Sequence, residues 1–231
     1  MSKRPFNPLR SAATALWLAL LMGALLPGCA NWPPQTDSLP GRKNTSNCDG
    51  SLSAADKTRL TGIEQLVGEG KFYAALAQLD ALGIDAPQAN LIRADALRRI
   101  DRTSEAQVLY QGLLNSCLDG RAQHGLGLIA SKAGQQAAGL AYLQKARQAL
   151  PTDSNIRNDL GYAYLLAGQY DAAEFEFLTV LDLNPQDAKA SRNLVLLAFM
   201  QGKTDKALTL ARKMGLDETT INRLQQQASK R

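Results

Sequence analysis

The chain has 231 residues, 45% of them hydrophobic, with a formal net charge of +5 and one histidine. Three of the basic residues lie in residues 1–28, so the remaining chain holds 23 basic and 21 acidic residues, a balance that argues against binding to nucleic acid. Because His124 is the only histidine, several His ligands or a supported His-based triad cannot form, and we expect no enzyme activity, metal site or cofactor.

Residues 1–28 have the layout of a secretory signal. A basic start with Lys3, Arg4 and Arg10 precedes an apolar run from Ala12 to Leu26, which is shorter than the roughly 20 residues of a membrane-spanning helix. The end of this segment, Leu26-Pro27-Gly28-Cys29, resembles the lipobox of bacterial lipoproteins. The resemblance implies lipidation of Cys29 and, with Ala30 following it, sorting to the outer membrane with the protein on the periplasmic face. The alternatives are an ordinary secretory signal with an incidental cysteine and a retained membrane anchor.

Residues 29–52 read as a flexible tether behind the lipidated cysteine, because prolines and glycines interrupt a stretch without apolar periodicity. Ser53, followed by Asp56, then has the pattern of a helix N-cap with an acid in the first turn. The sequence therefore predicts that helical structure begins at residue 53.

The stretch from Asn158 to Pro185 has the residue pattern of one helical hairpin. Small residues where two helices approach, large residues opposite them, a turn glycine and a closing proline resemble the tetratricopeptide repeat (TPR). These positions are taken by Leu160, Gly161, Tyr164, Gly168, Tyr170, Ala173, Phe177, Val180 and Pro185.

The same pattern recurs along the chain. At a spacing of 34 residues it is carried upstream by Leu126, Gly127, Gly134, Gly139, Leu143, Ala146 and Pro151, and downstream by Leu194, Gly202, Ala207 and Ala211. Two weaker copies consist of Ala94, Leu97, Ala106, Tyr110 and Leu113, and of Leu66, Gly70, Phe72, Ala75 and Leu79. We therefore expect an all-α TPR solenoid of about five hairpins over residues 53–216. Residues 217–231, with Ile221 and Leu224 on one face and polar residues elsewhere, predict a C-terminal capping helix.

Two further cysteines, Cys48 and Cys117, are placed for a disulfide. In stacked hairpins the start of a first helix and the end of a second helix lie at the same end, which favours the pair in an oxidising periplasm. Two free thiols are the alternative.

A partner is expected to bind the concave face that the first helices of the hairpins build. The hairpin register places on that face Asp95, Arg98, Arg121, His124, Leu128, Asn155, Asn158, Tyr162, Lys189, Arg192, Leu196 and Phe199. The Lys–Asn arrangement of carboxylate-clamp TPR proteins is not reproduced there, although Lys189 and Arg192 can meet an acidic segment.

The Cys29 signal, the placement of Cys48 and Cys117 and the segment NIRNDLGYAYLLAGQYDAAE together resemble the tight-adherence (Flp) pilus assembly lipoproteins. The resemblance covers nearly all of the chain after the signal. It implies a non-enzymatic outer-membrane lipoprotein that assists assembly of the pilus secretin, similar in role to a pilotin, and supports adhesion and biofilm growth. The alternatives are a type IV pilotin-like protein, a generic envelope adaptor that recruits cell-wall hydrolases, and, without lipidation, a soluble periplasmic peptide-binding module.

Overall fold

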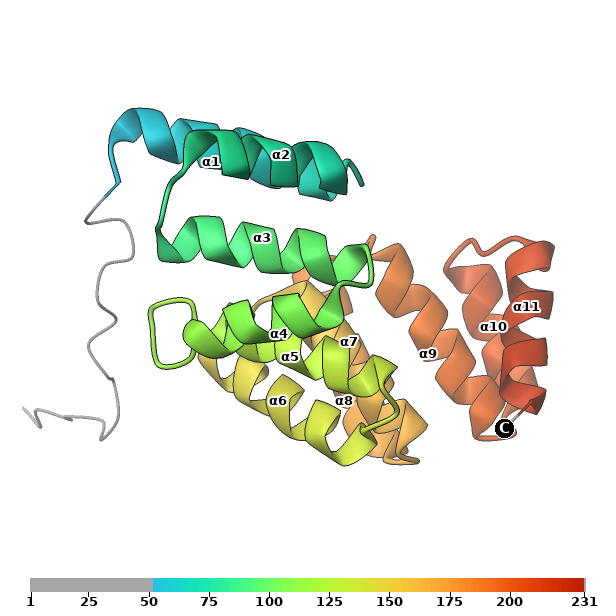
Figure 1. The fold of residues 1–231 in the computed structure, drawn as a ribbon. Coiled ribbons are helices and arrows are strands. Elements are labelled where there is room, and N and C mark those ends of the chain that lie inside the picture. The colour runs from blue at the N-terminus through green and yellow to red at the C-terminus, as the bar shows by residue number, and fades with distance from the viewer. Residues whose placement is uncertain (1–51, 231) are drawn as a thin grey trace, which may run out of the picture. The chain divides into compact units, whose positions relative to one another are not determined.

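The computed structural model describes residues 52–230, which form eleven helices and no strand (Figure 1). The predicted signal segment, the lipidated Cys29, nearly all of the tether and Cys48 lie outside the described residues. The helices are α1 (Ala54–Gly68), α2 (Phe72–Leu82), α3 (Pro87–Arg99), α4 (Thr103–Gly112), α5 (Asp119–Lys132), α6 (Gln136–Ala149), α7 (Ser154–Leu166), α8 (Tyr170–Leu183), α9 (Ala188–Met200), α10 (Thr204–Lys213) and α11 (Glu218–Ser229).

Successive helices pair into five hairpins, from α1 with α2 to α9 with α10, and α11 follows as a single helix. The second helix of each of the first four hairpins packs on the first helix of the next one, and neighbouring first helices also contact each other. The first helices α1, α3, α5, α7 and α9 therefore form one continuous layer. This arrangement confirms the predicted all-α repeat fold.

The ends of the helices follow from local chemistry. The predicted N-cap at Ser53 is confirmed, because its side chain accepts a hydrogen bond from the backbone N–H of Asp56. Asp153, Asp187 and Asp217 cap α7, α9 and α11 in the same way. The hairpin turns need a left-handed residue, with φ between 72° and 79° at Gly70, Gly134, Gly168 and Gly202, and Asp101 takes this place with φ 64° in the second hairpin.

The core includes many of the repeat positions that the sequence singled out. Leu160, Ala173, Phe177 and Val180 are fully buried in the fourth hairpin, and Tyr110 and Leu113 are buried in the second. A Cβ atom on Gly161 would lie 2.6 Å from Cε1 of Phe177, so the glycine lets the ring sit directly against the backbone of α7. The small residue and the large residue of this repeat are thus matched partners across the fourth hairpin.

The C-terminal helix α11 packs on α9 (Figure 1). Its apolar residues Ile221 and Leu224 are 3% and 6% exposed and join the core cluster of the last two hairpins. Gln227 Nε2 also donates a hydrogen bond to the Tyr162 hydroxyl at 3.3 Å. The helix therefore covers the layer of first helices at this end of the repeat array.

Candidate functional site: a pocket on the first-helix layer

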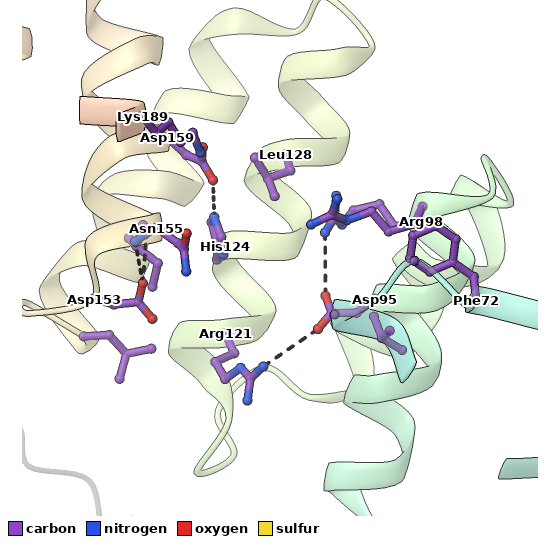
Figure 2. A pocket seen from close by; sticks show the side chains of 16 residues that line it. Phe72, Asp95, Arg98, Arg121, His124, Leu128, Asp153, Asn155, Asp159 and Lys189 are labelled. Carbon is purple, nitrogen blue, oxygen red and sulfur yellow. Dashed lines mark hydrogen bonds and ion pairs between the residues drawn. The ribbon is translucent and has the colours of Figure 1, made fainter. Parts of the chain in front are cut away.

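A pocket of about 540 Å³ opens on the layer of first helices (Figure 2). We call it the first-helix pocket. It draws charged side chains from four successive hairpins, so it exists only when the repeats are stacked. Its lining consists of Val67, Gly68, Gly70, Phe72, Asp95, Arg98, Arg99, Arg121, His124, Leu128, Leu150, Asp153, Asn155, Ile156, Asp159 and Lys189.

One side of the pocket is organised around the carboxylate of Asp159 on α7 (Figure 2). Its Oδ2 accepts a hydrogen bond from His124 Nε2 at 2.7 Å, and its Oδ1 accepts one from Lys189 Nζ at 2.5 Å. Because a carboxylate oxygen only accepts, Nε2 of His124 carries the proton in this contact. The three residues come from α5, α7 and α9, so a single carboxylate links three hairpins.

Two opposing effects act on the pKa of Asp159. Burial raises it, but the hydrogen bond from His124 and the charge of Lys189 outweigh the burial, and the pKa lies below its usual value. Asp159 is therefore ionised at neutral pH, and Lys189 supplies its counter-charge.

The opposite side of the pocket is organised around Asp95 on α3. Its Oδ1 accepts a hydrogen bond from the buried Tyr110 hydroxyl at 2.5 Å, and that hydroxyl in turn accepts one from Arg98 Nε at 3.3 Å. Arg121 reaches across from α5, with one guanidinium nitrogen 3.9 Å from Asp95 Oδ2 and 2.8 Å from Glu64 Oε1. Burial and the nearby charge of Asp95 raise the pKa of Tyr110, so the hydroxyl stays protonated and donates.

Two acidic side chains of the pocket are paired with basic ones, and one further basic side chain has no acidic partner in the described part of the chain. Asp95 and Asp159 each lie near two basic side chains, and Asp153 is occupied as the N-cap of α7. Arg99 lines the pocket, and within residues 52–230 it makes no ion pair. The surface is thus suited to an incoming group that is anionic or accepts hydrogen bonds.

Seven of the predicted groove residues line this pocket: Asp95, Arg98, Arg121, His124, Leu128, Asn155 and Lys189. Tyr162 and Arg192 are half-buried and lie outside its lining. Tyr162 is instead held by the hydrogen bond from Gln227 of α11.

Three predicted groove residues are not available to a partner, and the prediction is wrong for them. Leu196 and Phe199 are 2% and 7% exposed and belong to the core cluster that includes Ile221 and Leu224 of α11. Asn158 is 1% exposed, and its Nδ2 donates to Asp187 Oδ1 at 3.4 Å. The capping helix and the start of α9 therefore occupy positions that repeat register alone places on an open face.

Sequence reasoning missed Asp159, which is central to the pocket, and Glu64, which pairs with Arg121. Asp159 follows Asn155 by four residues and so lies on the same helical face, a spacing that could have indicated it. Glu64 belongs to the weakest repeat copy, in which the register is hardest to assign.

Other kinds of site find no support in the described part of the chain. Residues 52–230 contain no group of three or more His, Cys, Asp or Glu side chains that could hold a metal ion. None of the described helices has the length and apolar character needed to cross a membrane. Cys117 is disulfide-bonded, and because Cys48 lies outside the described residues, the pairing of these two cysteines stays a prediction.

Known proteins share the repeat fold. No family model matches the sequence. The solved structure of YrrB, described as a TPR protein with an unusual peptide-binding site, superposes with a TM-score of 0.52 at 24% identity, over 75% of this chain and 91% of that one. MamA from Desulfovibrio magneticus superposes with a TM-score of 0.55 at 18% identity, over 76% of this chain and 99% of that one. At these identities the likeness shows the fold alone.

A protein with a similar sequence identifies the family of this chain. The TPR repeat-containing protein PA4299 of Pseudomonas aeruginosa is 35% identical over 201 residues, which are 87% of this chain and 79% of the relative. The chain therefore belongs to the family of TPR repeat-containing proteins that includes PA4299.

Proposed function

We propose that this chain is a lipid-anchored outer-membrane adaptor that binds a periplasmic protein through the first-helix pocket and assists assembly of a secretin in an Flp pilus system. The observation that carries the binding role is a pocket whose charged groups come from four hairpins, in a fold that in other proteins serves protein–protein interaction. The lipid anchor and the pilus system are supported by the Leu26–Cys29 motif and by the family resemblance of the sequence.

The chemistry of the pocket favours an acidic, extended segment of the partner. Its two central carboxylates are neutralised internally, whereas Arg99 lines the cavity and makes no ion pair within residues 52–230. Asn155 is exposed at the rim and offers an amide that can hold a peptide backbone. No step in this role requires a chemical reaction, so we propose a binding protein and not an enzyme.

Purified components test the binding role. The periplasmic domains of the secretin encoded with the pilus genes are titrated with the native protein and with the Arg99→Glu/Lys189→Glu variant. We expect saturable binding to the native protein and a loss of at least tenfold in the variant, because each exchange turns an attraction into a repulsion. Equal binding of both proteins would place the contact elsewhere, and binding of a different secretin or of wall hydrolases only would assign the adaptor to another machine.

A labelling experiment tests the anchor separately. Cells that express the native protein or Cys29→Ser are fed a fatty-acid probe, and the purified proteins are compared. We expect label on the native protein only, and its recovery in the outer-membrane fraction. Equal label on both proteins would contradict the lipoprotein assignment and leave a soluble periplasmic binding module.

A further inference from the structure

A second depression lies on the opposite kind of surface, which the second helices α8 and α10 of the last two hairpins form. It runs between α8 and α10 with α9 as its floor, and it comprises cavities of about 670 and 170 Å³ that share Leu178, Leu194 and Leu210. We call it the second-helix groove. Besides the shared leucines, its lining includes Glu174, Leu181, Ser191, Ala198, Lys206 and Lys213.

The equivalent place one repeat earlier is filled by polar side chains. Arg157 NH1 donates to the buried Glu176 Oε2 at 2.6 Å, and Arg147 Nε lies 3.5 Å from Glu176 Oε1. Beside them, Gln144 Nε2 donates to the Tyr164 hydroxyl at 3.0 Å. Long side chains and an ion-pair network therefore close the space between α6 and α8.

A shift of 34 residues removes every member of this network. Gln144, Arg147, Arg157, Tyr164 and Glu176 are replaced by Leu178, Leu181, Ser191, Ala198 and Leu210. All five replacements line the second-helix groove. Shorter or apolar side chains thus stand where the previous repeat has two arginines, a glutamate and a tyrosine, so the groove is open and its walls are apolar.

Part of this apolar surface is exposed to solvent. Leu178 is 45% exposed, and Phe175, which lies one turn earlier on α8 and outside the lining of the groove, is 61% exposed. The floor helix α9 has 13 residues, which correspond to roughly 20 Å or between three and four helical turns. Large side chains left in water along a groove of this length are typical of a docking surface.

The charges at the two ends of the groove differ. At one end, Lys206 on α10 pairs with Glu174 on α8 at 3.2 Å and bridges the two walls. At the other end, Lys213 lines the groove and makes no ion pair within residues 52–230. A single unneutralised cation beside an apolar trough favours an occupant that carries an acidic residue next to its apolar stripe.

We propose that the second-helix groove binds an amphipathic helix of a partner protein, with leucine-like residues facing α9 and an acidic residue facing Lys213. A helix with apolar residues at i, i+3, i+4 and i+7 presents a stripe of the required length. This site is distinct from the first-helix pocket, so the adaptor can hold two segments at once.

The test uses a fluorescent synthetic helix of about 14 residues, with leucines at those spacings and flanking glutamates, titrated by anisotropy. The decisive variant rebuilds the network of the previous repeat through Leu178→Gln, Leu181→Arg, Ser191→Arg, Ala198→Tyr and Leu210→Glu. Because the chain already folds with these residues one repeat earlier, the rebuilt groove is filled without an unpaired charge. We expect at least tenfold weaker binding than to the native protein.

Matched controls distinguish binding in the groove from nonspecific binding to exposed apolar side chains. Val108→Gln removes an apolar side chain that is 67% exposed on α4, and we expect it to leave binding unchanged. Lys213→Glu should weaken binding of the glutamate peptide and strengthen binding of the same peptide with lysines in their place. A lone Leu178→Gln variant, with its thermal midpoint checked, covers the case in which the rebuilt groove does not fold.

Three kinds of result would overturn the proposal. One is the absence of groove-dependent peptide binding, seen either as no saturable binding or as equal binding to the native and rebuilt proteins. Another is a concentration-dependent dimer, measured by light scattering, that the rebuilt groove abolishes, because the groove would then hold a second copy. The third is groove-dependent binding to phosphatidylglycerol vesicles, which would make the surface a membrane contact.

Discussion

The buried ion pair between α7 and α8 gives a quantitative prediction. Arg157 and Glu176 side chains are 10% and 3% exposed, and two other groups complete the site: the Pro151 carbonyl accepts from Arg157 Nε at 2.5 Å, and Arg147 approaches Glu176. In Glu176→Leu the guanidinium of Arg157 stays buried without its counter-charge. Removing one partner of a buried pair costs roughly 3–5 kcal/mol, and for a domain of this size that corresponds to a fall in Tm of roughly 6–20 °C.

The matched control removes the charges together. The triple variant Arg147→Leu, Arg157→Ser and Glu176→Leu copies the residues that the next repeat carries at these positions. Because no uncompensated charge remains, most of the lost stability should return. Both proteins are measured by thermal and urea unfolding followed by circular dichroism. A Tm of Glu176→Leu within about 2 °C of the native value, or a triple variant less stable than the single one, would refute the reasoning.

Three further predictions follow from single contacts. Gly161→Ala places a Cβ atom 2.6 Å from the Phe177 ring, so we expect a loss of about 1–3 kcal/mol in urea unfolding. Leu224→Asp puts a charge into the contact of α11 with α9 and should lower the Tm while exposing the last hairpin to proteolysis, whereas an unchanged digestion pattern would show that α11 does not protect it. The folded-state pKa of Asp159 lies below its usual 3.8, so its stabilising effect is present at neutral pH and is lost as the pH falls through the folded pKa. The stability difference between the native protein and Asp159→Asn should therefore shrink below about pH 4, and a constant difference would contradict the assignment.

The hairpins could be predicted from the sequence because their packing is local and repeats. Gly161 and Phe177 lie 16 residues apart and meet within one hairpin, so residue size at fixed spacing is sufficient to place them. The turn of the second hairpin shows the limit of this reasoning. Asp101 replaces the expected glycine at positive φ there, a conformation that aspartate tolerates and that a search for glycine overlooks.

The pocket could be predicted only in part, because its details depend on how the hairpins are placed on one another. Asn158 and Asp159 are neighbours on α7, yet the first is buried against Asp187 and the second faces His124. Which of two adjacent residues faces a pocket depends on the rotation of the helix against its neighbours, which repeat alignment does not report. Leu196 and Phe199 belong to the core cluster that α11 joins, and the sequence of α11 indicates an amphipathic helix without showing where it docks.

The second-helix groove could be located from the sequence but not interpreted from it. The substitutions that open it are visible in the sequence once the repeats are aligned, but their meaning requires the structure. The contacts of Arg147 with Glu176 and of Gln144 with Tyr164 show that these positions meet across two hairpins. Differences between repeats within one chain can therefore indicate sites, provided that one repeat supplies the contacts against which another is compared.

Crosslinking in intact cells measures directly whether a partner occupies the first-helix pocket. A photoreactive amino acid is placed at Leu128 in the pocket or at Val108 on the exposed face of α4, and the crosslinked products are identified by mass spectrometry. We predict that the pilus secretin is crosslinked from Leu128 and not from Val108. Crosslinking of the secretin from Val108 alone, or from neither position while the two proteins still purify together, would contradict the account.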